Sequence, residues 1–202
     1  MSAGHAMPMS AEEMLSEARR ITGIEIRDEA ALEPLRVLLR SYNEDAGFTV
    51  HGAKAKHDYI MRFLTNRLRM QRDFAAHPEI HDIPLKTPLI INAMGRTGST
   101  KLQKVLAATG AFNYLPMWMA LNPASYTGVP HEDPAPRIAD TQRFIDWFIA
   151  ASPMAHAGHA MIAQAPDEDS YVMMHSMVSQ TLSGYAAALS YLDWYVGQDL
   201  SL

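Results

Sequence analysis

Residues 88–100 read Pro-Leu-Ile-Ile-Asn-Ala-Met-Gly-Arg-Thr-Gly-Ser-Thr, and this stretch decides the expected fold. Its first six residues form a short, mostly apolar run bounded by turn residues, the pattern of a strand buried on both faces. A tight glycine turn follows at 94–100. The apolar spacing within 101–109, which places Leu102, Val105 and Leu106 on an inward face, predicts a helix that stops at Gly110. We therefore expect a strand, a glycine loop and a helix in succession.

The residues that precede this stretch predict helices. Ser10-Ala11-Glu12-Glu13 has the spacing of a capping box, and Gly23 is the expected end of the first helix. Apolar periodicity predicts a second helix over about 30–46 and a third over about 53–75. Residues 77–87 contain prolines and no periodicity, so we interpret them as a linker. The expected domains are an N-terminal helical extension over 1–87 and a second domain over 88–202.

The second half of the chain carries weaker patterns. A short strand is expected at 112–115 and a proline-containing loop at 116–136. Helices are expected at 140–150 and at 167–182, the latter with three acidic residues at its start.

Composition limits the class of protein. Of the 202 residues, 48% are hydrophobic and 19% charged, which excludes global disorder and coiled coil. The net charge of −5 predicts no nucleic-acid partner. The absence of cysteine excludes disulfides and thiolate chemistry and fits a reducing compartment, so the cytoplasm is the expected location. No uninterrupted apolar stretch is long enough for a membrane span.

The glycine loop predicts an anion site. Gly95 and Gly98 allow a sharp turn that points backbone N–H groups toward the start of a helix, where the dipole favours negative charge. Arg96 adds a forked cation, and Ser99 and Thr100 add hydroxyl donors. The spacing does not fit the ATPase loop GxxxxGK[ST], and GxGxxG is absent. An ordinary turn between a strand and a helix is the alternative.

The loop resembles that of the sulfotransferases that use 3'-phosphoadenosine 5'-phosphosulfate (PAPS), in the bacterial-type family with the pattern G-R-[ST]-G-[ST]-T. Further segments look like this family in the same order: Asn66-Arg67-Leu68, Leu115-Pro116-Met117-Trp118, Pro136-Arg137-Ile138, and His159 followed by Pro166-Asp167-Glu168-Asp169. The resemblance implies an α/β fold after the N-terminal helical segment, with an incomplete parallel sheet like that of P-loop nucleotide kinases.

The resemblance also implies a reaction, in which the chain moves a sulfuryl group from PAPS, as co-substrate, to a hydroxyl or amine of a small-molecule acceptor. Arg96 would contact the bridging and sulfonate oxygens of PAPS. The remaining loop residues would complete the clamp on the 5'-phosphate: Gly95, Thr97, Gly98, Ser99 and Thr100. Such a transfer needs an oxyanion clamp and a base near the acceptor, and no metal.

Two residues are candidates for the base. In sequence, His156 and His159 lie at a separation from Arg96 similar to that of the catalytic histidine in the cytosolic branch of the superfamily. Of the two, His159 is our candidate for the base. Other branches use a glutamate, and Glu168 lies in the family-like segment. The plain alternatives are a solvated histidine and an acidic residue that caps a helix start.

Two positions depart from the family pattern. Met119 stands where many relatives have a glutamate directly after the tryptophan, and Lys101 replaces the usual apolar residue after the loop. His156, His159 and His175 share no helical face and no ligand motif, so we expect no metal site.

The basic residues are unevenly distributed. In the family the 3'-phosphate of PAPS is held by basic groups from a later part of the domain, and this sequence has no Lys or Arg after Arg143. The chain therefore resembles the N-terminal portion of a longer sulfotransferase, expected to associate with a second copy or with a missing C-terminal half. The alternatives are a non-catalytic, partner-binding remnant that retains the phosphate loop, and a small-molecule kinase that uses ATP.

Overall fold

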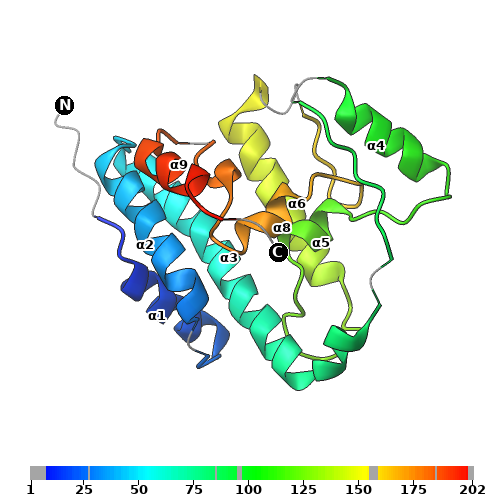
Figure 1. The fold of residues 1–202 in the computed structure, drawn as a ribbon, viewed down its shortest axis with the longest axis horizontal. Coiled ribbons are helices and arrows are strands. Elements are labelled where there is room, and N and C mark those ends of the chain that lie inside the picture. Colours follow the sequence, from blue (N-terminus) through cyan, green and yellow to red (C-terminus); the bar gives the residue numbers. More distant parts are fainter. Residues whose placement is uncertain are drawn as a thin grey trace. The chain divides into compact units, whose positions relative to one another are not determined.

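The structure, a computed structural model, describes residues 8–26, 28–84, 86–94, 97–154, 159–184 and 186–199 (Figure 1). These residues form helices joined by loops. The α-helices are α1 (Ala11–Thr22), α2 (Glu29–Glu44), α3 (Val50–Ala76), α4 (Ser99–Ala108), α5 (Met117–Leu121), α6 (Ala135–Ala151), α8 (Ser170–Met174) and α9 (Leu189–Val196), and the 3-10 helices are η1 (Pro78–Asp82) and η2 (Gln180–Leu182).

The chain divides into two compact units. The terminal unit contains the residues up to Arg72 and those from Val172 onward, and the central unit contains Asp73–Tyr171. The domain boundary predicted between residues 87 and 88 lies within the central unit and stays a prediction.

The terminal unit begins with α1, which starts and ends where the sequence predicts. The Ser10 side chain accepts a hydrogen bond from the Glu13 backbone N–H at 3.4 Å, and Gly23 closes the helix with a φ of 68°. Because that φ belongs to the left-handed region, glycine suits the position better than any other residue. The predicted second and third helices are likewise confirmed as α2 and α3.

The core of the terminal unit joins α2 to α9, a helix that the sequence did not predict. Tyr42 and Tyr191 are completely buried, and their hydroxyl groups donate hydrogen bonds to the carbonyl oxygens of Leu182 (2.6 Å) and Met177 (2.8 Å). A buried hydroxyl without a partner would oppose folding, so these bonds allow both rings to contribute apolar burial. The last part of the chain thus completes the core of the first.

Replacing Ser10 by alanine should lower the free energy of unfolding of the terminal unit by about 1 kcal/mol, because the Glu13 N–H loses its cap. Urea unfolding followed by circular dichroism measures the change. The control is Ser16→Ala, at an exposed position inside the same helix, which should be neutral or slightly stabilising because alanine favours helix. Equal destabilisation by both variants would contradict a capping role.

The central unit corrects the predicted fold class. No strand or sheet occurs among the described residues, whose only bridge is an isolated antiparallel one between Pro116 and Pro166. The expected incomplete parallel sheet of the P-loop nucleotide-kinase type is therefore wrong, as are the strands expected at 88–93 and 112–115. The physical reason is that a strand needs a neighbouring strand for its backbone groups, and the described part of the chain offers 112–115 only the single bond from the Asp167 N–H to the Leu115 carbonyl oxygen, beside the isolated bridge, and offers 88–93 no strand.

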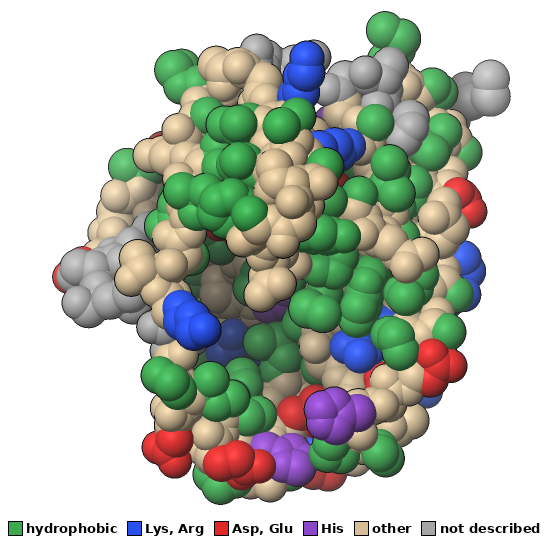
Figure 2. All heavy atoms as spheres, turned by 90° about the vertical axis from the view of Figure 1, so that its right-hand side faces the viewer, with side chains coloured by type: hydrophobic (Ala, Val, Ile, Leu, Met, Phe, Trp, Pro, Cys, Tyr) green, Lys and Arg blue, Asp and Glu red, His purple; other side chains and the backbone are tan. Residues whose placement is uncertain are grey.

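The apolar run at 88–93 belongs to no helix or strand and is largely exposed, contrary to its predicted burial. Leu89 and Ile90 are 62% and 75% exposed. The helix expected at 101–109 is confirmed as α4, but its predicted inward face is wrong, since Leu102 and Val105 are about half exposed. Figure 2 shows that hydrophobic side chains reach the surface among polar and charged ones.

The other late elements match the sequence in part. The helix expected at 140–150 is confirmed and extended as α6, which packs against α5. The single helix expected at 167–182 is wrong. It is replaced by α8 and η2, and between them Met177 adopts a φ of 62°, which is incompatible with a continuous right-handed helix.

Candidate functional site

The predicted anion loop leads directly into α4. Gly95 and Arg96 lie outside the described residues. Thr97 closes a turn by donating its hydroxyl hydrogen to the Met94 carbonyl oxygen at 2.6 Å, and Gly98 adopts a φ of 94° as the N-cap of α4. That φ is one that L side chains rarely adopt, which explains a glycine at this point.

The first turn of α4 has the properties of an anion-binding helix start. Ser99 and Thr100 are its first two residues and are half-buried, and no side chain caps the helix N-terminus. The first N–H groups of a helix lack partners within the helix, so they need an outside acceptor. Thr97, Gly98, Ser99 and Thr100 thus come together at one exposed helix end, where a phosphate-like group could accept these hydrogen bonds.

The same helix is fastened to residues 159–168, here called the histidine segment. The Gln103 side-chain amide donates a hydrogen bond to the Asp167 carbonyl oxygen at 2.7 Å, and the Lys104 ammonium donates one to the Ala160 carbonyl oxygen at 3.1 Å. Both donors come from the turn of α4 that follows the loop. The helix that begins at the predicted phosphate loop therefore also fixes the segment that carries both candidate bases.

His159 is paired with a buried carboxylate. Its Nε2 lies 3.0 Å from Oδ1 of Asp167, and the Asp167 residue is only 5% exposed. The same Oδ1 accepts the Glu168 backbone N–H at 2.8 Å. On the other side of the ring, His159 Nδ1 lies 3.9 Å from the Glu168 carboxylate. The structure thus brings the two predicted base candidates side by side.

The charges around His159 act on its pKa in both directions. The hydrogen bond with Asp167 raises the pKa of His159 above 6.5, burial lowers it, and the charges of Asp167 and Glu168 raise it further. The Lys104 ammonium lowers the pKa of the ring. The net result is an increase, so the imidazolium form persists to a higher pH than for a free histidine.

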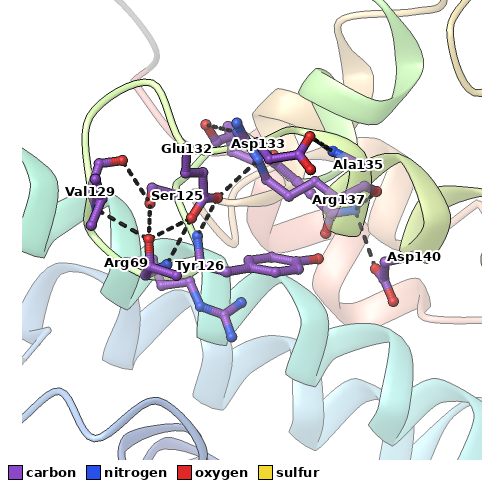
Figure 3. Close-up of polar contacts among 12 residues, drawn as sticks. Arg69, Ser125, Tyr126, Val129, Glu132, Asp133, Ala135, Arg137 and Asp140 are labelled. Atoms are coloured by element: carbon purple, nitrogen blue, oxygen red, sulfur yellow. Dashed lines mark hydrogen bonds and ion pairs between the residues drawn. The ribbon is translucent and has the colours of Figure 1, made fainter.

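Glu132 is the acceptor at the centre of the loop that precedes α6, and Figure 3 shows its contacts. Glu132 accepts hydrogen bonds from the Tyr126 backbone N–H and the Thr127 hydroxyl, each at 2.7 Å, and pairs with Arg137 Nε at 3.3 Å. The Arg137 guanidinium in turn lies over the Trp118 ring, 4.9 Å from its centroid. Cation and ring stabilise each other, which holds the indole in one orientation.

The Trp118 segment is also tied to the residues just before Asp167. The backbone N–H groups of Met117 and Trp118 donate to the carbonyl oxygens of Ala165 (3.0 Å) and Ala163 (2.9 Å). Met119, which departs from the family pattern, is exposed. The start of α5 and the histidine segment are therefore held together within the central unit.

Three residues of this arrangement were not identified from the sequence. In the sequence, Asp167 stands in the family-like segment and at the acidic start of an expected helix with no role assigned to it, and Gln103 and Lys104 are ordinary helix residues. Sequence spacing could not identify these three residues, because each acts through a contact that forms only when a loop folds back on itself.

His156 lies outside the described residues, and His175 is buried in the terminal unit with its ring edge-to-face against Phe63, 5.0 Å between centroids. Within the described ranges, no group of three or more potential ligands could hold a metal ion.

The helices were also tested for a membrane span. In the part of the chain that the structure describes, none combines the length and the apolar character that crossing a bilayer requires.

Comparisons with known proteins give two informative matches. No protein-family model matches the chain, and a search of curated proteins finds no match. Among solved structures, the chain is similar to the sulfotransferase STF1 of Mycobacterium tuberculosis H37Rv, with a TM-score of 0.72 and 27% identity over 95% of this chain and 53% of that one. It is similar in fold to the sulfotransferase STF9 of Mycobacterium avium, with a TM-score of 0.75 and 24% identity over 94% of this chain and 49% of that one. The chain thus spans about half the length of the structures that it matches.

Proposed function

We propose that the chain, which is similar in structure to a sulfotransferase, transfers a sulfuryl group from PAPS to a hydroxyl or amine of a small-molecule acceptor. One observation carries the proposal: the fold matched to a sulfotransferase over 95% of the chain contains an uncapped helix start directly after the family-like loop. The histidine segment, fastened to the same helix, supplies the second requirement, a base in the same unit.

Each group has a distinct role in the proposed reaction. The backbone N–H groups at the start of α4, with the Ser99 and Thr100 hydroxyls, hold the 5'-phosphate, and Arg96 neutralises the charge on the bridging oxygen. The acceptor oxygen or nitrogen attacks sulfur in line, and the bond between sulfur and the bridging oxygen breaks. The bonding electron pair leaves with the phosphate, so the second product is adenosine 3',5'-bisphosphate. The acceptor proton passes to His159 or Glu168.

A non-catalytic nucleotide-binding protein is the second candidate. It rests on the same uncapped start of α4 as the transferase, with no base acting on an acceptor. Both candidates use the same loop. They differ in whether sulfate is transferred once the nucleotide is bound.

The test is a calorimetric titration of the folded chain with adenosine 3',5'-bisphosphate. Binding should be detectable, and Arg96→Ala should weaken it by about 10- to 100-fold, the loss expected for charge-assisted hydrogen bonds. The control is Arg20→Ala, which removes a largely exposed arginine from α1 and should leave the affinity unchanged. Absence of binding by a folded chain would overturn both candidates, and tighter binding of magnesium ATP would indicate a kinase instead.

A further inference from the structure

We propose that Asp167 is a positioning residue, which holds His159 so that its Nδ1 receives the acceptor proton while Glu168 stabilises the imidazolium that forms. This inference rests on the proposed sulfuryl transfer and assigns different roles to the two candidate bases. Its starting point is the arrangement of one ring between two carboxylates in the histidine segment.

The contact with Asp167 decides which ring nitrogen is free to act. An ionised carboxylate only accepts hydrogen bonds, whereas a neutral imidazole has one donor and one acceptor nitrogen. At 3.0 Å from Asp167 Oδ1, Nε2 must be the donor. The lone pair that can take a proton is therefore on Nδ1, the nitrogen on the Glu168 side.

Asp167 is suited to positioning because its own place is fixed on several sides. Its backbone N–H donates to the Leu115 carbonyl oxygen at 3.4 Å, and its carbonyl oxygen accepts from Gln103 at 2.7 Å. Its Oδ1 also holds the Glu168 N–H. A buried carboxylate restrained in this way can keep the ring of His159 in one orientation and one tautomer.

Glu168 has the geometry of a charge stabiliser and not of a hydrogen-bonded partner. Its carboxylate is 3.9 Å from Nδ1, too far for a hydrogen bond, and its side chain is 57% exposed. When the acceptor proton moves to Nδ1, the ring gains a positive charge between Asp167 and Glu168, which both favour it. Lys104 opposes this charge from α4 and limits the effect.

The first test follows the ring itself and needs no substrate. In the full chain labelled with nitrogen-15 in histidine, two-dimensional NMR of the ring nitrogens over a pH titration reports the tautomer and the midpoint of His159, assigned by its loss in His159→Gln. We expect neutral His159 to carry its proton on Nε2 and to titrate above pH 6.5. Asp167→Asn should lower the midpoint by removing the charge, and Asp167→Ala should also remove the tautomer preference.

Two further variants separate the carboxylates. Glu168→Gln should lower the midpoint by less than Asp167→Asn and leave the tautomer unchanged. Asp169→Asn, at the exposed neighbouring position, is the matched control and should have no effect. A proton on Nδ1 in the neutral wild type, or an unchanged midpoint in a folded Asp167→Asn, would overturn the inference.

The second test measures sulfate transfer from PAPS to a panel of phenols and amines as a function of pH. The rate should fall on the acidic side with the His159 midpoint, and Asp167→Asn should move that limb to lower pH and reduce kcat more than it changes KM. A merely structural role of Asp167 would leave the limb where it is. If the ring titrates as expected but neither binding nor transfer occurs, the proposed function fails. If transfer occurs but the acidic limb of the pH–rate profile does not move in Asp167→Asn, the inference alone fails.

Discussion

Replacing Arg67 by methionine should lower the free energy of unfolding of the terminal unit by about 3–5 kcal/mol, the cost of leaving a buried charge without its partner. Arg67 forms an ion pair through Nε with Asp28, whose side chain is only 2% exposed, and its Nη1 donates to the His175 carbonyl oxygen at 3.2 Å. Asp28 also caps α2 by accepting the Ala31 N–H at 3.2 Å. The substitution thus leaves the Asp28 carboxylate, which caps the start of α2, without its cationic partner.

Urea unfolding followed by circular dichroism measures this effect, and two variants make it specific. The double variant Arg67→Met with Asp28→Asn should recover much of the loss, because asparagine can still cap α2 and no buried charge remains. Arg20→Met, at an exposed arginine, should change stability little. A loss below about 1 kcal/mol for Arg67→Met would show that water reaches Asp28 and that the pair contributes little.

Glu132→Ala should have the second large effect, about 3 kcal/mol or more on the central unit, because it leaves several donors, and the Nε of the half-buried Arg137, without an acceptor. Burial raises the pKa of Glu132, but hydrogen bonds from the Thr127 hydroxyl and from backbone N–H groups outweigh it and lower the pKa to about 2. A carboxyl whose pKa is depressed on folding stabilises the fold above its ordinary value of 4.5 and loses that contribution as the pH falls toward 2.

The pH dependence distinguishes this mechanism from simple loss of packing. In Glu132→Gln, which keeps the size but removes the charge, the unfolding midpoint in urea should fall at pH 7 and approach that of the wild type near pH 2. Asp146→Asn makes the same change at an exposed position and should follow the wild type at every pH. A constant difference between Glu132→Gln and wild type across the titration would rule out the charge as the cause.

The helical part of the fold could be predicted from the sequence because its determinants are local. The Ser10 cap and the left-handed Gly23 act within one turn of α1, and apolar periodicity marks α2 and α3. The packing of α9 against α2 could not be predicted, since no sequence feature near residues 189–196 indicates which helix they contact. The buried Tyr42 and Tyr191 are recognisable as apolar residues but not as neighbours.

The error over the sheet has a physical origin. An apolar run such as 88–93 indicates a segment that would gain free energy from burial, but burial also needs a surface, and strand pairing needs another strand. The sequence of the run itself does not indicate whether a covering surface or a partner strand is available. In the described part of the chain both are missing, so the same residues form no strand and are largely exposed.

The likeness to sulfotransferases could be recognised from motifs, and the structural similarity to a sulfotransferase agrees with it. The roles of individual site residues stay predictions. His159 and Glu168 were chosen by resemblance, whereas the contact that orders them, from Asp167, depends on how a loop folds back on itself. Residue type can suggest a base, but only the three-dimensional arrangement says which of its atoms is available.

The exposed segment 86–94 has a practical consequence for anyone who handles the protein. Its backbone belongs to no helix and has no strand partner among the described residues, and the side chains of Leu89, Ile90 and Met94 are exposed. Proteases cleave exposed segments outside regular structure, and unpaired apolar segments tend to associate. The segment is therefore the place where we expect nicking by proteases during purification and association at high concentration to begin.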